Sequence, residues 1–181
     1  PVLVDSDQTL GIAPKDLKEK ISERTKVIMV IPMLGGVSKI GEIMEVVRKV
    51  NNSRLQNNLT KIFVLEDCAQ SLGAHAFGIP GSSEINLPEG SYKLGTFGDI
   101  GTFSFQATKT ITTGEGGALL LNDRKLFTYW SPILKTSSRF LLPHILQESA
   151  FFIDKSGFIT KSIKELFKKD NMKYSVEISV S

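Results

Sequence analysis

Two short apolar runs on either side of an amphipathic segment restrict what this chain can fold into. The first run covers 27–33 (VIMVIPM) and the second covers 61–65 (KIFVL). Each has the length of a strand, and an unbroken apolar run is typical of a strand buried on both faces. Between the runs, apolar residues recur at helical spacing: Ile40, Ile43, Met44, Val47 and Val50. The order strand, helix, strand predicts a parallel β-α-β unit with a right-handed crossover.

Further elements extend this α/β pattern along the chain. Strands are predicted at 100–105 and 118–121, and a short one at 2–4. A helix is predicted from Pro14, because the first turn of a helix tolerates proline. The fold class that follows is α/β, with a mostly parallel sheet and flanking helices.

The remaining stretches give weaker signals. The polar stretch 51–60 is predicted to be a surface linker, and 79–98, rich in Gly, Ser and Pro, to be a long excursion. A helix is predicted to begin after Asp123. From Ser131 onward, the pattern no longer separates helix from strand.

Composition excludes several classes of function. Lys and Arg number 22 against 19 Asp and Glu, a net charge of +3 with no basic stripe, which argues against a nucleic-acid partner. No apolar stretch approaches the roughly 18 residues of a membrane span. The single cysteine, Cys68, excludes an internal disulfide and a CxxC metal site and favours a reducing, cytoplasmic location. The opening PVLVDSD has neither an initiator Met nor a signal-peptide layout, so we expect the chain to be part of a longer polypeptide.

Two polar stretches follow buried strands and carry the candidate chemistry. They are 66–74 (EDCAQSLGA) and 98–118 (GDIGTFSFQATKTITTGEGGA). In parallel sheets, ligands bind beyond the carboxyl ends of the strands, where a carboxylate, an amide, a hydroxyl and a lysine from these stretches can converge. That set suits pyridoxal 5'-phosphate (PLP), which has a basic ring nitrogen, an aldehyde and a phosphate.

The same two stretches resemble the signature segments of the DegT/DnrJ/EryC1/StrS family of PLP-dependent aminotransferases. The likeness covers about 1–123, since PVLVDSD and ERTKVIMVIPMLGG also match the run before those signatures. It implies the large domain of PLP fold type I, as in aspartate aminotransferase, and a homodimer in the full-length form. It also implies a nucleotide-linked keto-sugar as substrate and an amino-acid donor, with glutamate favoured.

The resemblance assigns roles to four residues and no metal ligand. It implies Asp67 on the pyridine nitrogen, Gln70 beside the ring and its hydroxyl, Ser104 on the phosphate and Lys109 as the Schiff-base lysine. Three of the four have a simpler interpretation as well. Asp67 then caps a turn, Ser104 bonds to backbone and Lys109 is a surface lysine.

The chain also departs from the family pattern. The glycine-and-hydroxyl turn that cradles the phosphate at a helix start would precede Pro1. The stretch 79–95 is longer than the connection expected there, and the region after Asp123 matches neither the family's next segment nor its small domain. We therefore expect a partial PLP-binding large domain at 1–130 and a divergent segment at 131–181.

Three functions remain open. The first is an aminotransferase of amino-sugar biosynthesis. The second is the dehydratase branch of the family, in which histidine replaces the lysine, so Lys109 argues against it. The third is a non-catalytic fragment. The other candidate residues give no signal for a catalytic or metal-binding role. Cys68 has no histidine nearby in sequence, and His75 and His144 lack metal-ligand spacing.

Overall fold

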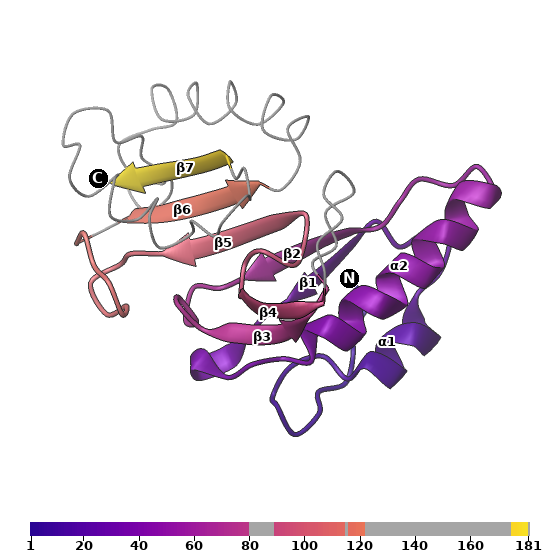
Figure 1. Cartoon of the computed structure of the whole chain (residues 1–181), viewed down its shortest axis with the longest axis horizontal. Coiled ribbons are helices and arrows are strands. Elements are labelled where there is room, and N and C mark those ends of the chain that lie inside the picture. The colour runs from indigo at the N-terminus through magenta and orange to yellow at the C-terminus, as the bar shows by residue number, and fades with distance from the viewer. Residues whose placement is uncertain (80–88, 115, 122–174, 181) are drawn as a thin grey trace.

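A five-stranded sheet with helices on one face forms the body of the protein (Figure 1). The structure is a computed structural model that describes residues 1–79, 89–114, 116–121 and 175–180. The helices are α1 (Pro14–Lys20), the short 3-10 helix η1 (Met33–Gly35) and α2 (Ile40–Gln56). The strands are β1 (Val27–Val30), β2 (Phe63–Asp67), β3 (His75–Gly78), β4 (Gly90–Lys93), β5 (Ile100–Ser104), β6 (Gly116–Leu121) and β7 (Ser175–Val180).

The strand order in the main sheet is β1-β2-β5-β6-β7. β1 pairs with β2 and β2 pairs with β5 in parallel, so the predicted β-α-β unit is confirmed, with α2 as its crossover. β6 then runs antiparallel to β5, and β7 runs antiparallel to β6. The predicted α/β class is confirmed, and the strands predicted at 100–105 and 118–121 correspond to β5 and β6.

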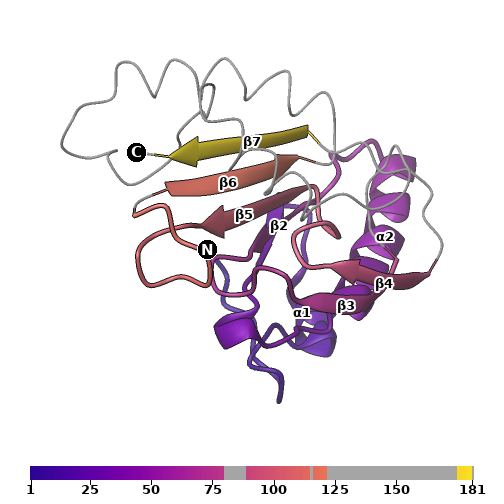
Figure 2. The same ribbon diagram turned by 60° about the vertical axis from the view of Figure 1, so that its left-hand side comes forward.

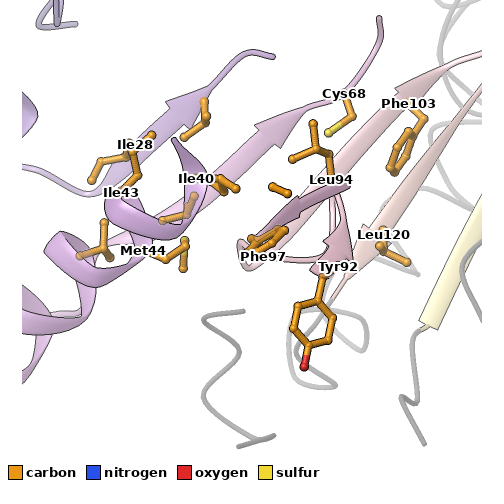
Figure 3. Close-up of a cluster of buried hydrophobic side chains, with 14 of the residues drawn as sticks. Ile28, Ile40, Ile43, Met44, Cys68, Tyr92, Leu94, Phe97, Phe103 and Leu120 are labelled. Carbon is orange, nitrogen blue, oxygen red and sulfur yellow. The ribbon is translucent and has the colours of Figure 1, made fainter. Parts of the chain in front are cut away.

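The hydrophobic core lies on one face of this sheet, beneath α2 and the separate β3–β4 hairpin (Figures 2 and 3). Alternate strand residues point into it, since side chains one apart in a strand face opposite sides. The labelled core side chains of Figure 3 are Ile28, Ile40, Ile43, Met44, Cys68, Tyr92, Leu94, Phe97, Phe103 and Leu120. Cys68 is buried in this core.

The other face of the sheet is less covered than its sequence predicts. The run at 27–33 favours burial on both faces, yet exposed and buried residues alternate in β1. Val27 is 55% exposed and Met29 is 47% exposed, and both lie on the face opposite the core. β1 is also the edge strand of the sheet among the described residues. The prediction of double-sided burial is therefore wrong for the part of the chain that the structure describes.

The predicted linker at 51–60 is wrong as well, because α2 continues to Gln56. Most of the stretch is exposed, as predicted, but the side chains of Asn51 and Arg54 bond to backbone of neighbouring segments. The Asn51 amide makes two hydrogen bonds with the backbone of Ile62, at 2.7 and 3.0 Å. The buried Arg54 guanidinium donates to four carbonyl oxygens: those of Ser22, Glu23, Thr25 and Thr60.

Two other predictions need correction. The stretch 2–4 forms no strand: Val2 and Leu3 are exposed, Val4 packs against the core, and the nearest pairing is an isolated bridge between Ser6 and Ile12. The excursion at 79–98 contains β4, which pairs with β3. The helix predicted after Asp123 lies outside the described residues. No helix in the described part of the chain is long and apolar enough to cross a membrane.

Candidate functional site

Asp67 and Ser104 lie on the same face of the sheet, each as the last residue of its strand. Asp67 ends β2 and Ser104 ends β5. Thr102 is the pairing partner of Asp67 across the two parallel strands, and it lies two residues before Ser104. Because side chains two apart share a face, Asp67, Thr102 and Ser104 all lie opposite the core. The predicted position of Asp67, at the carboxyl end of a buried strand, is confirmed.

The two oxygens of the Asp67 carboxylate have different surroundings. Oδ1 accepts a hydrogen bond from the backbone N–H of Ala69 at 3.2 Å and lies 3.4 Å from the Thr102 hydroxyl. No described residue donates a hydrogen bond to Oδ2. Asp67 is half-buried, and among the described residues only Oδ1 is held by hydrogen bonds.

Lys109 lies in the loop that joins β5 to β6, just beyond Ser104. Its backbone N–H donates to the Gln106 carbonyl at 2.9 Å, and the loop closes where the Thr113 N–H donates to the Phe105 carbonyl at 2.9 Å. The lysine side chain is half-buried. Within the described residues, no hydrogen bond links it to Asp67, Gln70 or Ser104. The structure thus places Lys109 after the strand that carries Ser104 without joining the two side chains.

Gln70 lies in the turn after β2 and is directed toward the end of β1. Its Oε1 accepts a hydrogen bond from the backbone N–H of Leu34 at 3.0 Å. Leu34 has a φ of 53°, a left-handed conformation that is rare for leucine. This contact ties the two turns together, while the contact of Gln70 with the ring of a cofactor stays a prediction.

This arrangement fits PLP at the level of its chemical groups. Oδ2 of Asp67, to which no residue in the described ranges donates a hydrogen bond, suits a protonated ring nitrogen. The Ser104 hydroxyl lies 3.4 Å from the N–H of Gln106 and can still donate its own hydrogen to a phosphate oxygen. Lys109 carries an amine, the group that an aldehyde of PLP would need. In the described part of the chain, no group of three or more His, Cys, Asp and Glu side chains could hold a metal ion.

The sequence alone did not single out Glu66, which is buried beside Asp67. Its side chain is fully buried, and its two oxygens accept three backbone hydrogen bonds. Gly95 donates at 2.8 Å, Phe97 at 2.8 Å and Gly98 at 2.7 Å. The apolar run before Glu66 gave no signal for this role, since acidic residues at strand ends usually face solvent.

A second carboxylate holds the same loop on β2. Asp99 accepts a hydrogen bond from the N–H of Val64 at 2.8 Å and donates its own N–H to the Val64 carbonyl at 2.9 Å. Its other oxygen lies 2.7 Å from Lys61 Nζ. The loop 95–99 leads directly into β5, so Glu66 and Asp99 together fix where Thr102 and Ser104 lie relative to Asp67.

Glu66 should make stability depend on pH. Burial raises the pKa of Glu66 from 4.5 to about 7, against the three N–H groups, which lower it. Between these values the folded protein holds a proton that the unfolded chain releases. The free energy of unfolding should therefore fall as the pH rises from 4.5 to 7, by up to about 1.4 kcal/mol per pH unit from this group.

Urea unfolding at several pH values measures this effect, with Glu66→Gln as the comparison because glutamine does not titrate. The difference in unfolding free energy between the parent and Glu66→Gln should change across this pH range. The control is Glu45→Gln, which removes a surface pair with Lys49 and should give a small difference. A difference for Glu66→Gln that is flat from pH 4.5 to 7 would refute the assignment.

Comparison with known proteins identifies relatives of this arrangement. The model of the DegT/DnrJ/EryC1/StrS aminotransferase family matches residues 1–139. A GDP-perosamine synthase of Escherichia coli O157:H7 is 38% identical over 128 residues, which are 70% of this chain and 29% of that protein.

Solved structures agree with this match. A sugar aminotransferase from Micromonospora echinospora has a TM-score of 0.55 and 32% identity, over 69% of this chain and 30% of that one. A GDP-4-keto-6-deoxy-D-mannose-3-dehydratase of E. coli with bound hydrated PLP has a TM-score of 0.51 and 29% identity, over 71% of this chain and 27% of that one. The chain therefore spans less than a third of the length of these relatives.

Proposed function

The chain belongs to the DegT/DnrJ/EryC1/StrS aminotransferase family. We propose that it carries the part of a PLP site that includes the Schiff-base lysine, in a sugar aminotransferase. The proposed reaction moves an amino group from an amino acid, with glutamate favoured, to a nucleotide-linked keto-sugar. The observation that carries the proposal is the placement of Asp67 and Ser104 on one sheet face, with Lys109 in the next loop. In the full-length form we propose a homodimer.

Each of the four residues has one role in this proposal. PLP, when bound, supplies an electron sink. Asp67 would hold a proton on the ring nitrogen through Oδ2, and Gln70 would lie beside the ring. Ser104 would donate a hydrogen bond to the phosphate. Lys109 would hold the cofactor through its amine and would supply the group that accepts and returns a proton next to it.

A non-catalytic fragment is the second candidate. Its support is the exposed apolar face at Val27 and Met29. A dehydratase is a third candidate, since a solved dehydratase is among the similar structures, but Lys109 is retained here where that branch has histidine.

Trapping PLP on the protein tests the cofactor site directly. Titration of the purified chain with PLP should give a visible absorbance band, and borohydride should fix the cofactor on Lys109, as peptide mapping would show. Lys109→Arg should abolish the trapped adduct because arginine does not react with the aldehyde under these conditions. Lys93→Arg, in β4, is the matched control and should leave the adduct in place. An adduct on Lys93 in the parent would remove Lys109 from the site.

Affinity and turnover then separate the first two candidates. We expect weak binding of PLP, because the described residues supply one hydroxyl and no helix-start cradle for the phosphate dianion. An amino-transfer assay with glutamate and a panel of nucleotide-linked keto-sugars measures turnover. Turnover supports the aminotransferase, whereas an adduct on Lys109 without turnover supports the non-catalytic fragment.

A further inference from the structure

Thr102 is the residue that faces Asp67 across the two parallel strands. Its hydroxyl lies 3.4 Å from Asp67 Oδ1 and 3.4 Å from the Glu66 carbonyl oxygen. We propose that Thr102 is a positioning residue for Asp67: its hydroxyl and the Ala69 N–H hold Oδ1 and so leave Oδ2 to the ring nitrogen of PLP. The inference rests on the proposed function and assigns a role to a residue outside the four named above.

The backbone fixes Thr102 beside Asp67 from two directions. The two residues are pairing partners in the β2–β5 ladder. The N–H of Cys68, the residue after Asp67, donates to the Thr102 carbonyl at 2.8 Å and extends the ladder past Asp67. Because threonine is branched at Cβ, its χ1 torsion is restricted in a strand, so the hydroxyl keeps its place relative to the carboxylate.

The single hydroxyl hydrogen of Thr102 has two acceptors within reach. An ionised carboxylate is a stronger acceptor than a peptide carbonyl, so the bond to Asp67 is favoured whenever the carboxylate carries its charge. Oδ1 has two donors, whereas no described residue donates to Oδ2. The site therefore presents Oδ2 to the ring nitrogen. Without the hydroxyl, one donor remains and the carboxylate gains freedom to rotate away from the ring.

The test compares how strongly the protein discriminates between PLP and an analogue in which CH replaces the ring nitrogen. Both carry the aldehyde and the phosphate. The dissociation constant of the analogue divided by that of PLP therefore reports on the ring nitrogen alone. The parent chain should bind PLP more tightly. Thr102→Val keeps the shape but removes the hydroxyl, and we expect it to reduce the ratio about three- to tenfold. Thr102→Ser restores a hydroxyl and should restore most of the ratio.

Controls separate this role from a structural one and from failure of the site. Thr25→Val, which precedes the amino end of β1, whereas Asp67 lies at the carboxyl end of β2, should leave the ratio unchanged. An equal loss of affinity for both ligands in Thr102→Val would mean a merely structural role and overturn the inference.

The Asp67→Asn variant distinguishes a failure of the inference about Thr102 from a failure of the proposed PLP site. If Asp67→Asn removes the discrimination and Thr102→Val does not, the inference fails while the site stands. If Asp67→Asn also leaves the ratio unchanged, or the parent chain binds neither ligand, both fail.

Discussion

Replacing Asp67 with Asn should slow amino transfer from glutamate to PLP by about a thousandfold or more. Asparagine has the same shape as aspartate but carries no charge to keep the ring nitrogen protonated. The loss of transition-state stabilisation is several kcal/mol. The fold should survive, because an asparagine Oδ1 can still accept from Ala69 and Thr102. The effect therefore reports on Oδ2, the oxygen that no described residue contacts.

Single-turnover absorbance with saturating glutamate measures the rate, with far-ultraviolet circular dichroism to confirm that the variant is folded. Asp16→Asn is the control, since this carboxylate pairs with Lys20 on α1 and lies away from the proposed site. It should change the rate less than twofold. Amino transfer by Asp67→Asn within tenfold of the parent would exclude Asp67 from the mechanism.

Hydrophobic periodicity predicted the parts of this fold in which a repeating pattern is long enough to be specific. The helical spacing from Ile40 onward and the apolar run at 61–65 located α2 and β2, and hence the strand end that holds Asp67. The β3–β4 hairpin was missed because each strand has four residues and is bounded by glycine, too short for a period to show.

Other errors arose where a polar residue serves a neighbouring segment. Asn51 and Arg54 look like linker residues in sequence, yet their side chains satisfy backbone groups of the segments that precede β1 and β2. Glu66 likewise looks like part of a polar strand end. Its partners are three N–H groups about thirty residues away, and no local pattern encodes such a contact.

The candidate site also has residues that the sequence located and one that it did not. The positions of Asp67, Ser104 and Lys109 follow from two signature stretches, and the structure places Asp67 and Ser104 on one face. The role of Thr102 depends on strand register, which links residues 67 and 102 only once the pairing of β2 and β5 is known. Register depends on packing of the whole sheet and cannot be obtained from either stretch alone.

Gly101 is a point at which the loop 95–99 closely approaches β5. It faces the core side of the sheet and is the pairing partner of Glu66 on β2. A Cβ built on Gly101 would lie 2.4 Å from the Gly95 carbonyl oxygen and 2.8 Å from the Gly95 Cα. These are backbone atoms, and the Gly95 N–H is bonded to Glu66, so the loop has little room to yield.

Gly101→Ala should therefore destabilise the protein by about 3 to 5 kcal/mol. The added methyl group pushes the loop away from β5 and weakens the hydrogen bonds that satisfy the buried Glu66 carboxylate. Urea unfolding, followed by circular dichroism, measures the loss. Gly73→Ala is the matched control: it has a φ of 85° but no atom within 4 Å of the added Cβ, so it should cost only about 1 kcal/mol of backbone strain. Equal losses in the two variants would mean that the contact of the loop with β5 contributes nothing, and the role of Glu66 in holding that loop would fail with it.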